Sequence, residues 1–276
     1  QQLVDQLVLS FLRSEKLQTH IRYLLEKGAM YRVCNGNLLY HGCIPMEPDG
    51  SFTRVTMGDK TYFGKSLMDA CDRLCRTAMY DRCMENTDLL WYLWCGPYSP
   101  LNGKDKIATF ERTFLDDPEA RTEQKNPYYD LWNSEETART ILTEFGVDFE
   151  RGHIINGHVP VRKTKGDTPI KANGKFINID GGLSKAYQPV TGICGYTLVY
   201  SSHELYLAEH QPFDPDTAAR ESADVLSRTI MIEQYPDRLR VHDTDGGADV
   251  ERRIADLKKL LAAYRSGLVR TPSRME

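Results

Sequence analysis

The sequence predicts an α/β fold followed by a helical C-terminal extension, and three observations lead to this prediction. Over the first 212 residues, segments with helical periodicity alternate with short apolar segments typical of strands. Two of the predicted strands end next to a histidine, His41 and His158. After residue 212 the apolar pattern becomes helical, so we assign residues 213–276 to an extension.

Composition limits the classes of protein to consider. The 276 residues are 41% hydrophobic and 27% charged, which is enough to bury a core. The formal net charge is −4 and the basic residues are scattered, which argues against a nucleic-acid partner. The longest apolar runs, such as Ile193 to Tyr200, are much shorter than a membrane-spanning helix, and no signal peptide opens the chain. Seven cysteines, an odd number, favour a reducing compartment, and we expect a cytoplasmic protein without a membrane partner.

The predicted elements of the first 212 residues follow from periodicity and turn residues. Apolar positions from Leu3 to Leu25 predict one long helix or two short ones, ending at Gly28. Asn35-Gly36 predicts a hairpin that places His41 at a strand end. A second hairpin is expected at 51–63, and helices are expected at 66–84 and 133–146. Strands are expected at 154–155, 176–180 and 193–200, and the last of these is expected to pair with 204–208. The irregular stretch 96–129 is expected to be an active-site loop.

In the extension, residues 214–232 and 250–264 have helical periodicity, and a short strand is expected at 238–242. An apolar stripe lies on the second of these helices and consists of Leu257, Leu260, Leu261 and Tyr264. It predicts packing against the domain or against another subunit, so a homo-oligomer is one hypothesis.

His41 and His158 are the candidate metal ligands. A neutral imidazole binds Mn, Fe or Zn, and the adjacent Gly42 and Gly157 let backbone approach closely. No known motif fixes the number of residues between the two histidines. The alternative is therefore that both are structural residues held by hydrogen bonds.

The segments around these histidines resemble a known superfamily. His41-Gly42-Cys43-Ile44-Pro45 resembles the metal-binding His-Gly-Gly segment of phosphoprotein phosphatases and related metallophosphoesterases. Gly157-His158 resembles their last metal histidine, and 177–198 resembles the strand, loop and strand that close their sheet. The resemblance implies a metallophosphatase-type sandwich of two mixed β-sheets flanked by helices, of which residues 1–212 would be the C-terminal part.

Longer runs resemble one family, the class III fructose-1,6-bisphosphatases, over nearly the whole chain: 37–45, 93–114, 154–161, 178–182, 191–198 and 254–265. This resemblance implies manganese-dependent hydrolysis of the 1-phosphate of fructose 1,6-bisphosphate in gluconeogenesis. Two metal ions would activate the attacking hydroxide and neutralise phosphoryl charge, and His41 and His158 would ligate one of them.

The chain departs from the superfamily pattern in an important way. The motifs Asp-x-His, Gly-Asp-x-x-Asp-Arg-Gly and Gly-Asn-His-Glu do not occur, and Cys43 replaces the second glycine of His-Gly-Gly. Two imidazoles alone hold a divalent metal poorly. A chain that begins Gln1-Gln2 also looks like part of a longer protein. We therefore expect an inactive fragment without bound metal, whose partner is the missing N-terminal half of the same polypeptide, and we assign no catalytic residue here.

Cations and an aromatic residue in the loops are the candidate substrate-binding residues. Arg112 is the candidate phosphate clamp, because a planar guanidinium binds phosphate at two points. Further cations could form a funnel for a bisphosphate: Lys104, Lys106, Arg162, Lys163 and Lys165. We expect Tyr187 to line the pocket and Asp180 to orient a ligand histidine.

Two other functions stay open at the level of sequence. One is a metallophosphoesterase for another phosphorylated sugar or for a phosphoprotein, which would share the metal histidines. The other is a non-catalytic module that serves assembly.

Overall fold

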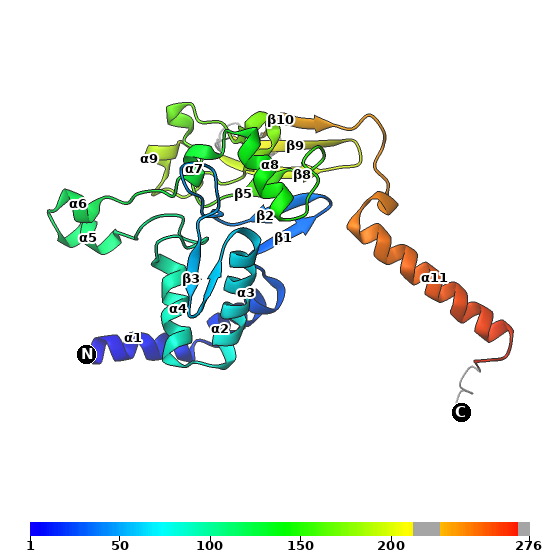
Figure 1. The fold of residues 1–276 in the computed structure, drawn as a ribbon, viewed down its shortest axis with the longest axis horizontal. Coiled ribbons are helices and arrows are strands. Elements are labelled where there is room, and N and C mark those ends of the chain that lie inside the picture. The colour runs from blue at the N-terminus through cyan, green and yellow to red at the C-terminus, as the bar shows by residue number, and fades with distance from the viewer. Residues whose placement is uncertain (212–226, 270–276) are drawn as a thin grey trace, which may run out of the picture. The chain divides into compact units, whose positions relative to one another are not determined.

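The structure, a computed structural model, describes residues 1–211 and 227–269 (Figure 1). Its contacts divide the chain into two compact units, residues 1–195 and 196–276, and each is described by itself. The boundary predicted after residue 212 adjoins undescribed residues and stays a prediction. Within the described residues, no helix has the combination of length and apolar character that crossing a bilayer requires.

The first unit begins with two helices, α1 (Gln2–Arg13) and α2 (Glu15–Lys27). Ser14 separates them: its backbone is extended, and its hydroxyl accepts a hydrogen bond from the Leu17 N–H at 3.4 Å. This N-cap explains why the apolar pattern gives two helices rather than one. Neither helix contains a buried residue.

A mixed five-stranded sheet, in the order β1-β2-β5-β7-β6, organises the first unit (Figure 1). Its strands are β1 (Tyr31–Cys34), β2 (Asn37–Tyr40), β5 (Ile154–Asn156), β7 (Phe176–Asn178) and β6 (Ile170–Lys171). The central strands β2, β5 and β7 are parallel, and β1 and β6 are antiparallel to their neighbours. The predicted hairpin is confirmed, since Asn35 and Gly36 form its turn at positive φ (48° and 76°). The predicted α/β class is confirmed as well.

A second hairpin and two helices follow the first hairpin. The hairpin consists of β3 (Val55–Met57) and β4 (Lys60–Tyr62), as predicted. The helices are α3 (Gly64–Tyr80) and α4 (Met84–Cys95). The predicted helix 66–84 corresponds to α3, which ends sooner because the chain is extended at Asp81 before α4 begins.

The stretch predicted to be irregular, 96–129, is largely irregular but carries three short helices. These are α5 (Thr109–Phe114), α6 (Pro118–Arg121) and α7 (Tyr128–Leu131). Tyr128 and Tyr129 of α7 are buried and contact each other edge to face. The stretch is therefore fixed to the core at its C-terminal end.

Helix α8 and three short elements complete the first unit. Helix α8 (Glu135–Glu144), which corresponds to the predicted helix 133–146, is capped by Ser134 and buries Ala138, Ile141 and Leu142. The short elements are η1 (Lys163–Lys165), η2 (Ala172–Gly174) and α9 (Gln188–Thr191). The core also contains the fully buried side chains Leu38, Ile44, Leu67, Ile154, Phe176 and Ile177.

The second unit contains an antiparallel sheet, in the order β10-β9-β8, and a long helix. The strands are β8 (Gly195–Tyr200), β9 (Glu204–His210) and β10 (Ser227–Gln234). The predicted pairing of β8 with β9 is confirmed. Strand β9 alternates buried and half-buried side chains, which is the pattern of a strand with one covered face.

Two predictions for the extension are wrong and one is confirmed. The predicted helix 214–232 begins outside the described residues, and its last part is strand β10, because Thr229, Ile230 and Ile232 fit a strand paired with β9. The strand predicted at 238–242 is absent there, and η3 (Val241–Asp243) overlaps its end. The predicted helix 250–264 is α11 (Asp245–Arg265), which begins five residues before the predicted start and ends one residue after the predicted end.

Candidate functional site

The candidate site lies where the parallel strands β2, β5 and β7 end. Because parallel strands end at the same edge of a sheet, the residues that follow them come close together. His41 follows β2, Gly157-His158 follows β5, and Asp180 lies two residues beyond β7. The Gly157 N–H donates to the His41 carbonyl oxygen at 2.9 Å, so the two histidine segments are also joined by backbone.

The structure brings the two predicted histidines into contact. The Nε2 atom of His41 lies 3.1 Å from Nδ1 of His158, and the rings meet edge to face with centroids 4.9 Å apart. The Nε2 atom of His158 lies 2.9 Å from the carbonyl oxygen of Asn102, which can only accept a hydrogen bond. His158 Nε2 therefore carries the proton in the neutral ring, and the lone pair of Nδ1 faces His41. A hydrogen bond of this kind is how proteins orient a metal-binding imidazole.

Burial and neighbouring charge shift the titration of this site. Burial lowers the pKa of His158, and the nearby His41 lowers it further. Both effects favour the neutral imidazole, which is the form that binds a metal ion. Burial raises the pKa of the Asp180 carboxyl, although the two histidines partly offset this effect. Asp180 therefore interacts electrostatically with both histidines, and its role in orienting one of them stays a prediction.

His158 also has an unusual backbone. Its φ angle is +68°, in the left-handed region that non-glycine residues seldom occupy. Such a conformation costs roughly 1–3 kcal/mol and is held only by surrounding structure. Here the surrounding structure is the hydrogen bond of Gly157 to His41 and that of the His158 ring to Asn102.

A buried tyrosine network supports the strand ends from inside the core. The hydroxyls of Tyr40 and Tyr128 are 2.7 Å apart, and the side-chain N–H of Asn156 donates to the Tyr128 hydroxyl at 2.6 Å. Burial raises the pKa of both tyrosines far above the usual value, so they stay neutral. The network links β2, α7 and β5 close to the histidines in the chain, since Tyr40 directly precedes His41 and Asn156 lies two residues before His158.

A cavity of about 390 Å³ opens beside the histidine pair. His41, His158 and Asn102 contribute its polar groups, and the rest of the lining is mainly apolar: Cys75, Leu90, Leu93, Trp94, Leu101 and Ile107. No lysine or arginine is among these described lining residues. The cavity alone therefore lacks the cations that hold a sugar bisphosphate.

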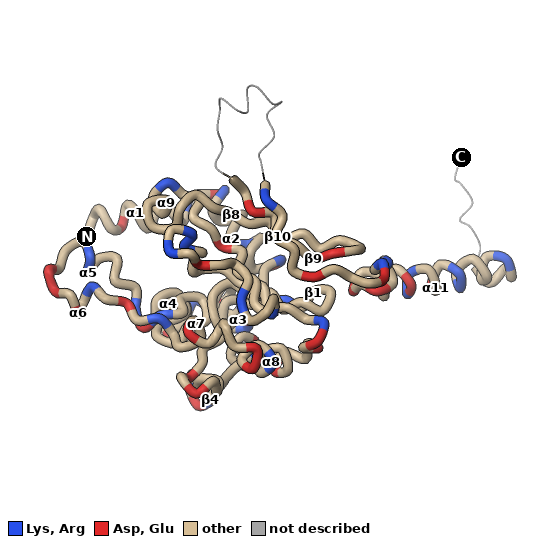
Figure 2. Tube along the Cα trace, turned by 90° about the horizontal axis from the view of Figure 1, so that it is seen from above, with Lys and Arg blue, Asp and Glu red and all other residues tan. Residues whose placement is uncertain are grey.

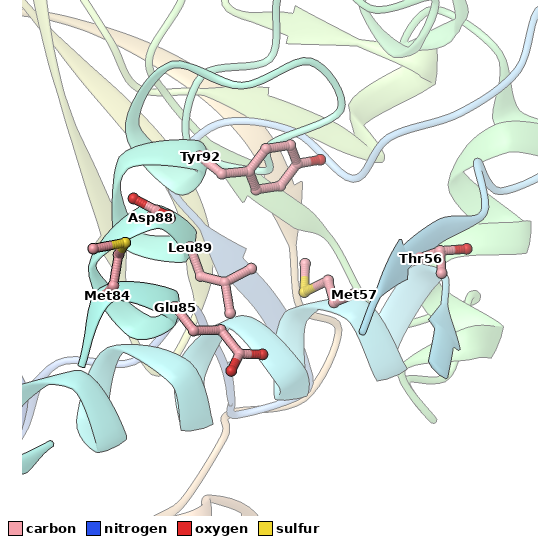
Figure 3. A pocket seen from close by; sticks show the side chains of 7 residues that line it. All are labelled: Thr56, Met57, Met84, Glu85, Asp88, Leu89 and Tyr92. Carbon is pink, nitrogen blue, oxygen red and sulfur yellow. The ribbon is translucent and has the colours of Figure 1, made fainter. Parts of the chain in front are cut away.

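A second pocket lies between β3 and α4, and Figure 3 shows the side chains that line it. Thr56 and Met57 come from β3, and Glu85, Leu89 and Tyr92 are among the contributions of α4. Its charged groups are the carboxyls of Glu85 and Asp88. Because carboxylates repel phosphate, this pocket is a poor candidate for the substrate of a phosphatase.

Two of the predicted phosphate-binding cations share one acidic partner. Lys104 Nζ lies 2.7 Å from Glu123 Oε2, and an Arg112 guanidinium nitrogen lies 3.2 Å from the same oxygen. Arg112 also donates to the Arg121 carbonyl. Lys104 is near the histidine pair, because its charge is one of the causes that lower the pKa of His158. Figure 2 shows both signs of charge interspersed around α5 and α6.

The other predicted binding residues lie elsewhere in the first unit. Lys163 is exposed in η1, and Tyr187, 58% exposed, precedes α9. The Thr164 hydroxyl joins these elements by donating to the Val190 carbonyl. Of the remaining funnel candidates, Lys106 donates to a carbonyl and Arg162 pairs with Asp167 at 2.9 Å. Arg112, Lys104, Lys163 and Tyr187 stay predictions as substrate-binding residues.

Asn102 and Glu123 have structural roles at this site that the sequence did not indicate. Asn102 contacts His158 through its backbone carbonyl, which any residue would supply, so its residue type could not mark this contact. Glu123 is an ordinary acidic residue in a charged loop, and only the folded loop places Lys104 and Arg112 beside it.

Comparison with known proteins decides the family. The family model described as "Firmicute fructose-1,6-bisphosphatase" matches residues 1–266. This chain belongs to that family. Proteins named fructose-1,6-bisphosphatase class 3 from Clostridium botulinum (strain Loch Maree / Type A3) and Clostridium tetani (strain Massachusetts / E88) are 51% and 49% identical over 274 residues. These alignments cover 97% of this chain but 41% of the relatives, so the chain spans less than half of their length. No solved structure matches.

The predicted resemblance to this fructose-1,6-bisphosphatase family is thereby confirmed. The donor set of a metal centre is incomplete, however. Among the described residues, no group of three or more His, Cys, Asp or Glu side chains is placed to hold a metal ion. Two imidazoles fit such a centre in identity and orientation but are too few to form it.

Proposed function

We propose that this chain is the C-terminal part of a longer, metal-dependent fructose-1,6-bisphosphatase that hydrolyses the 1-phosphate of fructose 1,6-bisphosphate in gluconeogenesis. The observation that carries the proposal is the contact of His41 with His158 at 3.1 Å, in a chain that matches the family over residues 1–266. The family match by itself supports only membership of the family. The contact between the two histidines supports a functional site within the part of the protein that this chain represents. All seven cysteines are free, which supports a reducing, cytoplasmic location.

His41 and His158 are proposed to supply two ligands of a divalent metal centre, with manganese as the preferred ion. The lone pair of His158 Nδ1 and the Nε2 atom of His41 converge on one place, as ligands of one ion require. The remaining donors, and the general acid or base, are proposed to come from the part of the longer protein that this chain does not span. When bound, such a metal lowers the pKa of water and neutralises phosphoryl charge.

The fold of the complete catalytic domain is proposed to be a sandwich of two mixed β-sheets flanked by helices. In support, the first unit contains one mixed sheet, with the candidate ligands at its parallel strand ends. Residues 1–212 would then be the C-terminal part of this domain, with 213–276 as an extension.

Arg112, Lys104, Lys163 and Tyr187 are proposed to bind the substrate. Arg112 and Lys104 are held together by Glu123, so a phosphate group would replace this carboxylate as their shared anionic partner. The electrostatic effect of Lys104 on His158 supports its placement near the reacting phosphate.

The test measures phosphate release from fructose 1,6-bisphosphate with manganese, using the complete protein that contains this chain. His41→Ala and His158→Ala are each expected to lower kcat/KM by at least about 100-fold and to reduce the manganese retained per protein. His20→Ala, which removes an exposed histidine of α2, is the control and should match the wild type. Wild-type activity in both site variants would refute the ligand assignment.

The isolated 276-residue chain supplies the second arm of the test. With two donors only, it is expected to retain no stoichiometric manganese and to release no phosphate. Turnover by this chain would show that the site is complete without further residues, contrary to the proposal.

A non-catalytic assembly module is the second candidate function, and the incomplete donor set of the described residues favours it for the isolated chain. A complete protein that neither binds manganese nor hydrolyses any phosphate ester would support this alternative. Activity on another phosphorylated sugar or a phosphoprotein, in preference to fructose 1,6-bisphosphate, would instead indicate a different metallophosphoesterase.

A further inference from the structure

Helix α11 carries an apolar seam with the spacing of a coiled coil. Val250, Ile254, Leu257, Leu261 and Tyr264 follow one another at alternating steps of four and three residues. This is the a/d pattern of a heptad repeat, with Ile254 and Leu261 at a, and Val250, Leu257 and Tyr264 at d. A period of 3.5 residues keeps such a seam on one side of a supercoiled helix.

The seam is exposed along its whole length. Its side chains are between 42% and 63% exposed: Val250, Ile254, Leu257, Leu261 and Tyr264. Leu260, at the adjacent g position, is 45% exposed and widens the apolar strip. Within the second unit the principal neighbour of α11 is η3, at its N-terminal end, and Gly247 is the one buried residue of the helix.

The helix is well formed at both ends although its seam is uncovered. The Thr244 hydroxyl accepts from the Gly247 N–H, and Asp245 places negative charge in the first turn. At the C-terminus, Gly267 has φ +77°, and the N–H groups of Gly267 and Leu268 donate to the carbonyls of Tyr264 and Ala263. This is a Schellman motif, which satisfies the last carbonyl groups. The helix therefore presents a preformed surface to a partner.

We propose that the α11 seam binds the same seam of a second copy of this chain, as an antiparallel two-stranded coiled coil. The proposal goes beyond the phosphatase reaction and does not depend on it. A coiled coil fits because the apolar strip repeats regularly and its e positions are charged, as in helix-to-helix seams.

The flanking charges favour the antiparallel orientation. The e positions are Glu251, Lys258 and Arg265, and the charged g position is Arg253. A parallel pair would set Arg253 of each copy against Lys258 of the other, which is repulsive twice. An antiparallel pair sets e against e, so that Glu251 of each copy meets Arg265 of the other, at the cost of one contact between the two Lys258 residues.

The ion pairs within the helix agree with this orientation. Arg253 is already paired with Asp249 of its own helix at 2.8 Å. Glu251 and Arg265 have no ion-pair partner among the described residues, so both remain available to a second copy.

The test is sedimentation equilibrium of the 276-residue chain, from about 1 to 300 µM, a range that suits a short coiled coil with weak affinity. The wild type is expected to form dimers. Leu257→Glu combined with Leu261→Glu should raise the dissociation constant at least about 100-fold, because charge would enter the centre of the seam. Both side chains are exposed in the single chain, so the double variant should keep its fold. Its circular dichroism spectrum, which should match that of the wild type, checks this.

A charge swap tests the orientation. Glu251→Arg should raise the dissociation constant about 10-fold, and adding Arg265→Glu to it should restore the wild-type value within about 3-fold. In a parallel pair these two positions do not meet, so no rescue would occur. Arg252→Glu, at the outward f position, is the control and should leave association unchanged.

Three results with the 276-residue chain would overturn the proposal. They are a monomeric wild type over the whole range, a dimer that persists in the double glutamate variant, and a Glu251→Arg defect that Arg265→Glu does not rescue. In the complete protein, an unchanged oligomeric state in the double glutamate variant would show that another surface joins the copies, which also contradicts the proposal.

Discussion

The glycines beside the two candidate ligands have very different surroundings. A Cβ atom at Gly42 would lie 2.5 Å from the Pro100 carbonyl oxygen, which already accepts a hydrogen bond from the Cys43 N–H. A Cβ atom at Gly157 would lie 3.6 Å from the Asp180 Cβ and 3.7 Å from the His41 oxygen, which are ordinary contacts. Gly42 therefore permits a close backbone approach, whereas the space beside Gly157 admits a methyl group.

Alanine at these two positions should have different effects. Gly42→Ala is expected to lower the free energy of unfolding by about 2 kcal/mol, because backbone must move away from Pro100. Gly157→Ala should change it by less than about 1 kcal/mol. Urea unfolding of the two variants, followed by circular dichroism, makes the comparison. Equal losses at both positions would contradict this account of the close approach.

The histidines show what a sequence can reveal at the scale of residues. They are 117 positions apart, and only the pairing of β2 with β5 makes them neighbours. Each histidine could be placed after a strand, because turn residues and apolar runs mark strand ends. The support from Asn102 could not be predicted, since it comes from a backbone carbonyl in a loop without periodicity.

At the scale of elements, Glu123 holds together the loop that carries α5 and α6. Its carboxyl accepts hydrogen bonds from Lys104 at 2.7 Å and from the Ala108 N–H at 2.9 Å, and it pairs with Arg112. Burial by itself raises the pKa of Glu123, but the hydrogen bonds from Lys104 and Ala108 outweigh it, and the net effect is a lowered pKa. Glu123 therefore stays ionised and anchors three points of the loop.

Replacing this carboxyl should loosen the loop. Glu123→Gln is expected to speed amide exchange of residues 104–123 about 10-fold at pH 7, a loss of about 1.4 kcal/mol. Glu119→Gln, which changes an exposed residue of α6, is the control.

The effect of Glu123→Gln should depend on pH. Because folding lowers the pKa of Glu123, its contribution is complete above the unfolded-state pKa of about 4.3 and disappears as the pH falls through the folded-state value. Wild type and variant should then exchange alike in acid. A difference that is independent of pH would refute the anchoring role of the carboxylate.

Elements with strong local signals were predictable, and those that depend on distant partners were not. The hairpin at Asn35-Gly36 and the capped helix α8 follow from turn and cap chemistry within a few residues. Strand β10 was predicted as a helix. Its conformation depends on pairing with β9, which residues 212–226 separate from it in the sequence, so the local pattern did not reveal the strand. Its register also shifts between Met231 and Glu233, which disturbs the simple alternation of a strand.

At the scale of the whole molecule, the sequence could predict the α/β class but not the limits of the compact units. The strands and helices of the first unit are marked locally, whereas the division after Gly195 depends on which elements pack together. The proposed metal site depends on packing in the same way, since only the parallel pairing of β2 with β5 brings His41 to His158. Most of the site's supports act through backbone or buried hydroxyl groups, which carry no sequence motif.

The apolar face of α1 is the clearest sign, at this scale, that the proposed longer protein packs against this chain. Its exposed apolar side chains are Leu3, Val4, Leu7, Val8, Phe11 and Leu12. An apolar patch of this kind on a protein surface usually marks an interaction site. We expect the part of the longer protein that is proposed to complete the metal centre to cover this face.

Substituting this face should therefore affect the complete protein and spare the isolated chain. Leu7→Gln combined with Phe11→Gln is expected to change the free energy of unfolding of the 276-residue chain by less than about 0.5 kcal/mol, because both side chains are exposed. In the complete protein the same pair should cost about 3 kcal/mol or more, because both would be buried. Chemical denaturation of both proteins, with Gln6→Ala on α1 as the control, makes the measurement. Equal small effects in the two proteins would show that the face remains exposed and that the missing part packs elsewhere.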